Sequence, residues 1–205
     1  GTVNDVFLAA LAGGFRRYLL GRGEPLDAMV LRAIVPVSRR LPGQPVRPGN
    51  LASAMFVELP VHVTAPAGRL AAVVARTAEQ KTREVADATA AVVQLADHIP
   101  AALLARGARR YGRSGQGRVN VVASNVPGPS QVQYLAGRQL LEMVPYVPTA
   151  QQVRVSAAMV SYTGRVTIGI TADADALPDV DRLIAAVGRE IGDLVALGSH
   201  PLPQP

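Results

Sequence analysis

The sequence VRVSAAMVSYTGRVTIGITA, residues 153–172, carries the clearest structural signal in the chain. Apolar residues alternate along both sides of the pair Thr163-Gly164, the pattern of two antiparallel strands joined by a short turn. Glycine at the turn tolerates the positive φ that tight hairpins require. The stretch therefore predicts a β-hairpin, and with it a sheet at the centre of the fold.

Strands and helices are predicted on both sides of this hairpin, without the regular alternation of a parallel α/β fold. Further strands are expected at residues 27–38, 51–63, 119–123, 131–135 and 139–144. Helices are expected at residues 2–19, 66–90, 92–97 and 100–111, and from Pro178 to the neighbourhood of Gly198. Pro36 places the end of its strand near a sheet edge. The order predicts an α/β fold of the two-layer α+β type, a mixed β-sheet with packed helices.

The first and last helices have readable ends and faces. Thr2 and Asp5 have the spacing of a reciprocal capping box. Two glycines, Gly13 and Gly14, weaken the first helix in isolation, so we expect another element to pack very close to them. In the last helix, one buried stripe is expected, formed by Leu183, Ile184, Val187, Ile191 and Leu194.

Composition limits the classes of function. Hydrophobic residues make up 49% of the 205 residues and charged residues only 18%. This composition fits a surface that is partly covered by a partner, and singly exposed aliphatic residues are the alternative. The absence of cysteine excludes disulfides and thiolate metal sites. No transmembrane run or secretory signal is present. A net charge of +6 favours an anionic partner, and a helix that starts directly after Gly1 suggests a piece of a longer protein.

No catalytic base can be identified in the sequence. The histidines, His62, His98 and His200, lie far apart and in no nucleophile or metal motif. Because acyl transfer and hydrolysis usually need such a base, we expect none of the three to be catalytic. We also expect no bound metal.

Two polar segments remain as site candidates. At the chain start, Asn4 and Asp5 either only cap the helix or also tie it to a neighbouring loop and so shape a cleft. The segment 124–129, read as a tight turn after a strand, offers donors from Ser124 and Asn125 to a developing oxyanion. Pro127 stiffens this turn and Gly128 permits positive φ. An ordinary strand-ending turn is the alternative.

A basic stretch is the third candidate. No acidic residue occurs between Asp97 and Glu142, and the interval holds Arg106, Arg109, Arg110, Arg113, Arg118 and Arg138. Arginine binds phosphate through two parallel hydrogen bonds. Coenzyme A phosphates and anionic lipid head groups are therefore candidate ligands, with a solvated loop as the alternative. Nucleic acid is not expected, because Tyr111 is the single aromatic residue available for stacking.

These segments, taken in order, resemble the bacterial wax ester synthase/acyl-CoA:diacylglycerol acyltransferase family. The resemblance begins with Asn4-Asp5 and the helix that follows. It continues through Val35-Pro36-Val37-Ser38-Arg39-Arg40 with Gly49-Asn50, and through Ser124-Asn125-Val126-Pro127-Gly128-Pro129 with Tyr134-Leu135-Ala136-Gly137. It ends with Ser161-Tyr162-Thr163-Gly164-Arg165 and the helix at Pro178-Asp179. Each motif is weak alone, but the ordered set spans nearly the whole chain.

The resemblance implies one lobe of the two-lobed, chloramphenicol-acetyltransferase-like fold, with residues 1–198 as the C-terminal lobe and 199–205 as a flexible proline-rich tail. It implies that an N-terminal lobe, absent here, supplies the general-base histidine in an HHxxxDG motif. That base activates a diacylglycerol or fatty alcohol to attack acyl-CoA, a substrate, with no tightly bound cofactor. Asn4 and Asp5 match the family's ND pair, which helps to shape the tunnel, and Ser124 and Asn125 match a strand end facing it.

The resemblance further implies a cytoplasmic enzyme, peripheral at a membrane or lipid droplet, that is inactive as this chain alone. Two alternatives remain open at the level of sequence. One is a non-catalytic lobe that binds coenzyme A or anionic lipid. The other is the C-terminal lobe of a polyketide-associated acyltransferase or of a condensation domain.

Overall fold

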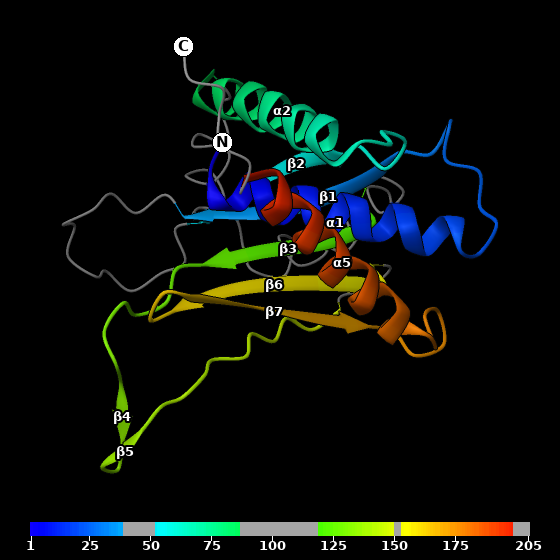
Figure 1. The fold of residues 1–205 in the computed structure, drawn as a ribbon. Coiled ribbons are helices and arrows are strands. Elements are labelled where there is room, and N and C mark those ends of the chain that lie inside the picture. The colour runs from blue at the N-terminus through cyan, green and yellow to red at the C-terminus, as the bar shows by residue number, and fades with distance from the viewer. Residues whose placement is uncertain (39–51, 87–118, 150–152, 199–205) are drawn as a thin grey trace, which may run out of the picture.

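The computed structural model describes residues 1–38, 52–86, 119–149 and 153–198, which form a mixed sheet with three helices gathered on one face (Figure 1). The helices are α1 (Val3–Leu20), α2 (Pro66–Ala86) and α5 (Val180–Gly198). The strands are β1 (Leu31–Ser38), β2 (Ala52–Leu59), β3 (Val121–Val126), β4 (Tyr134–Leu135), β5 (Arg138–Gln139), β6 (Val155–Tyr162) and β7 (Arg165–Ala172). The expected mixed α/β architecture is confirmed.

The main sheet has the strand order β2-β1-β3-β6-β7. Its three central strands, β1, β3 and β6, run parallel, and each outer strand is antiparallel to its neighbour. The carboxyl ends of the central strands therefore lie at one end of the sheet. The predicted hairpin is confirmed as β6–β7, and both turn residues, Thr163 and Gly164, have positive φ, as a two-residue turn requires.

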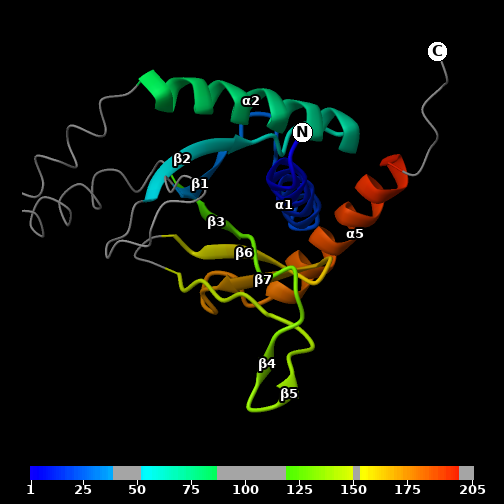
Figure 2. The same cartoon turned by 90° about the vertical axis from the view of Figure 1, so that its left-hand side faces the viewer.

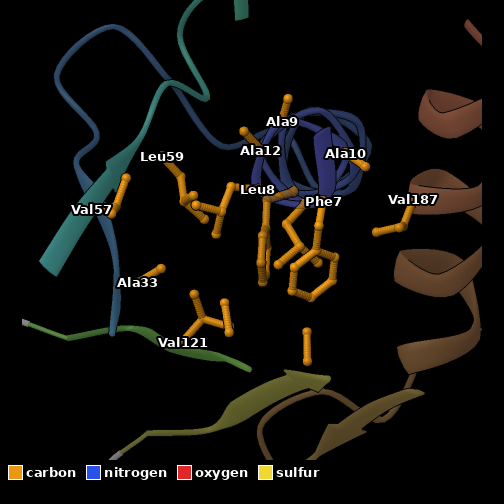
Figure 3. Close-up of a cluster of buried hydrophobic side chains, with 14 of the residues drawn as sticks. Phe7, Leu8, Ala9, Ala10, Ala12, Ala33, Val57, Leu59, Val121 and Val187 are labelled. Carbon is orange, nitrogen blue, oxygen red and sulfur yellow. The ribbon is translucent and has the colours of Figure 1, made fainter. Parts of the chain in front are cut away.

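Helix α1 lies between the sheet and the other two helices (Figure 2). It is therefore buried almost all round, from Phe7 to Phe15. Phe7 and Leu8 point from α1 toward Leu59 of β2 and Val121 of β3, and Val187 approaches from α5 (Figure 3). The core thus unites both layers of the fold around one helix.

The glycine pair in α1 explains how close α5 approaches. A Cβ atom at Gly13 would lie 2.1 Å from Cδ of Glu190, and one at Gly14 would lie 2.3 Å from Cγ2 of Val187 and 3.0 Å from its backbone. Any side chain here would separate the helices, so the expectation of a close neighbour is confirmed.

Several predicted boundaries are wrong. The strand expected from residue 27 starts at Leu31, and the strand expected to reach residue 63 ends at Leu59. The tight turn expected at residues 124–129 is strand up to Val126, because pairing with β6 continues that far. The short strands expected at residues 131–135 and 139–144 are two residues each.

The last helix and the proline in β1 also differ from expectation. Helix α5 begins at Val180, after the predicted Pro178, and Ile184 of the predicted stripe is exposed. Pro36 lies on an inner strand, not on an edge strand. However, β1 pairs with β3 only at Ala33 and Ile34, so Pro36 lies beyond this pairing and disrupts no bond to β3. The expected helices at 92–97 and 100–111 and the tail at 199–205 lie outside the described residues.

Candidate functional site

Asp5 fastens the start of α1 to α2. Its Oδ2 accepts hydrogen bonds from the Thr2 backbone nitrogen at 2.6 Å and from Thr2 Oγ1 at 2.9 Å, which completes the predicted capping box. Its Oδ1 accepts a hydrogen bond from Thr77 Oγ1 of α2 at 2.7 Å. The carboxylate is 3% exposed. A charge buried this deeply needs several donors, so this geometry gives Asp5 an architectural role.

Asn4 differs from its neighbour. Its Oδ1 is buried and, among the described residues, it is the single buried side-chain polar atom without a hydrogen-bond partner. An unsatisfied buried acceptor costs about 1–3 kcal/mol. Asp5 therefore ties α1 to helix α2 through Thr77, not to a loop as expected, and Asn4 Oδ1 forms no such tie.

The second candidate pair lies at the carboxyl end of β3. Ser124 and Asn125 pair with Ala158 and Met159 of β6 and are partly buried. Side chains alternate across a strand, and Ala123 of β3 is in the core. Asn125 therefore shares the helix-covered face of the sheet and Ser124 the opposite face, so the two side chains cannot serve one oxyanion together.

The segment after β3 is held tightly against the hairpin. The backbone nitrogen of Gly128 donates a hydrogen bond to Ser161 Oγ at 3.1 Å. A Cβ atom at Gly128 would lie 2.0 Å from the Ser161 carbonyl oxygen, so only glycine fits there. Pro127 precedes this contact at an exposed position. Close backbone packing, not positive φ, explains the glycine.

The two candidate pairs lie at the same end of the molecule. The first turn of α1 and the carboxyl ends of β3 and β6 lie on the same side of the molecule, at the left of Figure 1. No hydrogen bond joins Asn4 or Asp5 to Ser124 or Asn125 within the described part of the chain. This end therefore combines amide and hydroxyl groups but has no described general base.

His62, the one histidine among the described residues, lies at the opposite end of the sheet. It is exposed in the turn after β2, a strand antiparallel to β1, and its carbonyl oxygen accepts a hydrogen bond from Arg16 Nη1 at 3.2 Å. Because β3 runs parallel to β1, the end of β3 and His62 are separated by the length of the sheet. His98 and His200 lie outside the described residues.

A buried ion-pair network is the feature that the sequence did not reveal. Glu190 of α5, fully buried, accepts a hydrogen bond from Arg69 Nε of α2 at 3.1 Å and from Arg17 Nε of α1 at 3.4 Å. Arg17 also forms an ion pair with Asp193. Glu190 lies three residues after Val187, on the same face of α5 as the apolar stripe. The glycine pair of α1 that faces it was the one feature of the sequence that indicated a close contact there.

A surface cavity of about 220 Å³ lies between the end of α1 and the start of α5. Its lining includes four arginines: Arg17, Arg22, Arg182 and Arg189. Tyr18 donates a hydrogen bond to Asp179 Oδ1 at 2.7 Å, and Arg22 Nη1 donates to the Tyr18 oxygen at 2.9 Å. The hydrogen bond between Tyr18 and Asp179 lowers the pKa of Asp179. The pKa of Tyr18 is raised, first by burial of the hydroxyl and then by that hydrogen bond.

The basic stretch that the sequence predicted as a ligand site lies mostly outside the described residues. Arg106, Arg109, Arg110, Arg113 and Arg118 lie outside the described residues. Among the described residues, no group of histidine, aspartate and glutamate side chains has the arrangement to hold a metal. None of the described helices has both the length and the hydropathy to span a bilayer.

Comparison with known proteins identifies relatives of the whole chain. A Mycobacterium tuberculosis protein named diacylglycerol O-acyltransferase tgs1 is 34% identical over 199 residues, 97% of this chain and 43% of that protein. A second M. tuberculosis protein with a diacylglycerol O-acyltransferase name is 33% identical over 196 residues, 96% of this chain and 40% of the relative.

A solved structure has the same fold. The wax ester synthase/diacylglycerol acyltransferase from Marinobacter aquaeolei VT8 matches with a TM-score of 0.71 and 25% identity, over 95% of this chain and 43% of that one. The chain thus spans less than half of the length of these relatives. The WS/DGAT C-terminal domain matches residues 48–194, and the chain belongs to this family.

Proposed function

We propose that this chain is the C-terminal lobe of an O-acyltransferase that moves a long acyl chain from acyl-CoA to diacylglycerol or a fatty alcohol. The observation that carries the proposal is the family match together with the share of the relatives that the chain covers. The relatives are named for this activity, and the chain corresponds to 43% of their length. The rest of their length leaves room for a second lobe, which we propose as the partner.

The proposed reaction needs a general base, and none of the described residues at the candidate site is a histidine that could act as one. A base removes the proton of the acceptor hydroxyl, and the oxygen attacks the thioester carbonyl. The carbon–sulfur bond then breaks, and coenzyme A leaves as the thiol with the proton. Since His62 lies at the far end of the sheet, we assign the base to the N-terminal lobe.

This lobe would contribute one wall of the reaction space. The Asn125 side chain, on the helix-covered face at the end of β3, could donate to the carbonyl oxygen of the thioester, where negative charge develops. Asp5 and Thr77 would fasten the first turn of α1 to α2 at the same end of the molecule. Acyl-CoA is consumed as a substrate, and no bound cofactor is required. Lipid acceptors favour a site at a membrane or lipid-droplet surface on the cytoplasmic side.

The experiment compares three preparations: this chain, the N-terminal lobe, and both lobes produced together. Each is given a long-chain acyl-CoA with diacylglycerol or a fatty alcohol, and lipid product and free thiol are measured. We expect product from the combined lobes alone. Equal activity in this chain by itself would refute the proposal, and exclusive use of a polyketide acceptor would move the chain to a different acyltransferase class.

A second candidate, a binding lobe without catalysis, is favoured by the arginine-lined cavity between α1 and α5. Phosphate groups of coenzyme A or of a lipid would suit its guanidinium groups. Binding of anionic vesicles by this chain alone, with no activity from the two lobes together, would favour this candidate.

A further inference from the structure

We propose that the surface cavity between the end of α1 and the start of α5 binds a phosphate group, at a site separate from the candidate reaction site. The cavity, of about 220 Å³, lies at the opposite end of the molecule from the carboxyl end of β3 (Figure 1). Helix α1 has 18 residues, so its two ends are about 27 Å apart. A ligand held here is far from Asn125, and the inference does not depend on the proposed acyl transfer.

Positive charge dominates the lining of the cavity. The lining contains four guanidinium groups and one carboxylate, that of Asp179. The carbonyl oxygens of Leu19 and Leu20, at the negative end of the α1 dipole, already accept hydrogen bonds from the backbone nitrogens of residues 22–24. A phosphomonoester carries a charge of about −1.5 to −2 at pH 7 and has three acceptor oxygens. It therefore matches several guanidinium groups at once.

Two of the four arginines are held in place by the protein. Arg17 Nε donates a hydrogen bond to Glu190 Oε2 at 3.4 Å. Arg22 Nη1 donates to the Tyr18 oxygen at 2.9 Å and to Asp179 Oδ1 at 3.1 Å, and its guanidinium lies 5.5 Å from the centre of the Tyr18 ring. These contacts order one side of the cavity before a ligand arrives, which lowers the entropy cost of binding.

The other two arginines can turn toward a ligand. No hydrogen bond or ion pair engages the Arg189 side chain within the part of the chain that the structure describes. Arg182 Nη1 lies 4.0 Å from Asp179 Oδ2, which is beyond hydrogen-bond distance. The two arginines are seven residues apart and exposed, so they lie two turns apart on one face of α5. A phosphate group between them would receive hydrogen bonds from both.

Small residues leave room for that phosphate group. Ala185 and Ala186 lie between the two arginines on α5, and Gly21 lines the cavity from the end of α1. Ala186 is buried, whereas Ala185 is exposed. A larger side chain at position 185 would therefore occupy the cavity without entering the core or changing the charge.

The test measures binding of phosphate from two sources at physiological salt, where attraction by distant surface charge is screened. Isothermal titration with inorganic phosphate and with coenzyme A, which carries a phosphomonoester, tests soluble ligands. Sedimentation with phosphatidylcholine vesicles that contain phosphatidic acid tests a lipid head group, and pure phosphatidylcholine vesicles are the blank. We expect binding of at least one of these probes, and the probe that binds identifies the source.

Four variants test the site itself. Arg189→Gln should weaken binding about tenfold, because a charge-assisted hydrogen bond is lost. Ala185→Leu should weaken it similarly at unchanged charge. Asp179→Asn should strengthen it about fivefold, because a negative charge leaves the cavity and Arg22 is released. The matched control Arg165→Gln, which removes one positive charge at an exposed position of β7 outside the cavity, should bind like the unsubstituted chain.

Three results would overturn the inference: no binding of any probe by the unsubstituted chain, equal weakening in Arg165→Gln and Arg189→Gln, or full binding by Ala185→Leu. Thermal unfolding verifies that each variant is folded. Acyl transfer by the two lobes together is a separate measurement, so the phosphate site and the proposed acyltransferase function can each fail alone.

Discussion

At the residue scale, the glycine pair of α1 sets two effects against each other. Alanine raises helix propensity by about 1 kcal/mol over glycine, but at Gly14 its Cβ would collide with Val187 of α5. Overpacking of a core costs about 1–3 kcal/mol, and the backbone of Val187 cannot rotate away. We therefore expect Gly14→Ala to lower the free energy of unfolding by about 1–2 kcal/mol, measured by urea denaturation.

Gly188 provides the control. It lies in α5 with nothing within 4 Å of a Cβ atom, so Gly188→Ala should stabilise the chain by up to about 1 kcal/mol. Stabilisation by both substitutions would show that α1 and α5 are not in close contact.

Asp179 is expected to contribute to the acid sensitivity of the fold. Its pKa is lowered from 3.8 chiefly by the hydrogen bond from Tyr18, so its stabilising effect is present above about pH 3.8 and is lost as the pH falls below it. The urea concentration at the midpoint of unfolding should therefore fall less between pH 5 and pH 2 in Asp179→Asn than in the unsubstituted chain. Asp27→Asn, at an exposed position before β1, is the control, and identical acid limbs for both variants would refute the assignment.

Residue-level prediction worked where the interaction is local. The Thr2–Asp5 capping box and the Thr163-Gly164 turn each involve neighbours in the chain, and both were readable. The Glu190 network was not, because Arg69 lies 121 residues away in sequence. Likewise Ser124 to Val126 looked like a turn from their own residues, and it is pairing with β6 that makes them strand.

At the element scale, Glu190 holds three helices together. Removal of one partner from a buried ion pair costs about 3–5 kcal/mol of stability. Because Arg17 remains paired with Glu190, the cost here should lie at the low end of this range. We expect Arg69→Met to cost about 3 kcal/mol in unfolding free energy, and Arg69→Met with Glu190→Leu to recover part of it. Arg76→Met, at a half-buried position of the same helix where the guanidinium donates to the Glu58 carbonyl oxygen, should cost about 1 kcal/mol. Equal losses for Arg69→Met and Arg76→Met would contradict the role of Glu190.

The hydroxyl of Tyr162 holds both ends of the β4–β5 hairpin, because it accepts a hydrogen bond from the Gln133 backbone nitrogen at 2.9 Å and donates one to the Leu140 carbonyl oxygen at 2.8 Å. Tyr162→Phe keeps the ring but removes the acceptor for the Gln133 amide, a bond worth about 1 kcal/mol net. Hydrogen exchange at Gln133 should accelerate about fivefold, whereas Tyr134→Phe, at an exposed ring, should leave it unchanged. Unchanged exchange in Tyr162→Phe would mean that other contacts hold the β4–β5 hairpin in place.

At the scale of the whole molecule, topology decides what the candidate site can do. Three parallel strands bring polar groups to one end of the sheet, while the antiparallel β2 carries His62 to the other. The sequence predicted a mixed sheet and an ordered set of motifs, but not which strand ends meet. The strand order depends on pairings between distant segments, which local patterns do not encode.

The central claim is that catalysis uses a base from outside this chain. The most direct test replaces His62, His98 and His200 together by alanine in the complete two-lobed enzyme and measures acyl transfer from acyl-CoA. The account predicts activity close to that of the unsubstituted enzyme. A loss of about 10²–10⁴-fold, the usual effect of removing a general base, would contradict it.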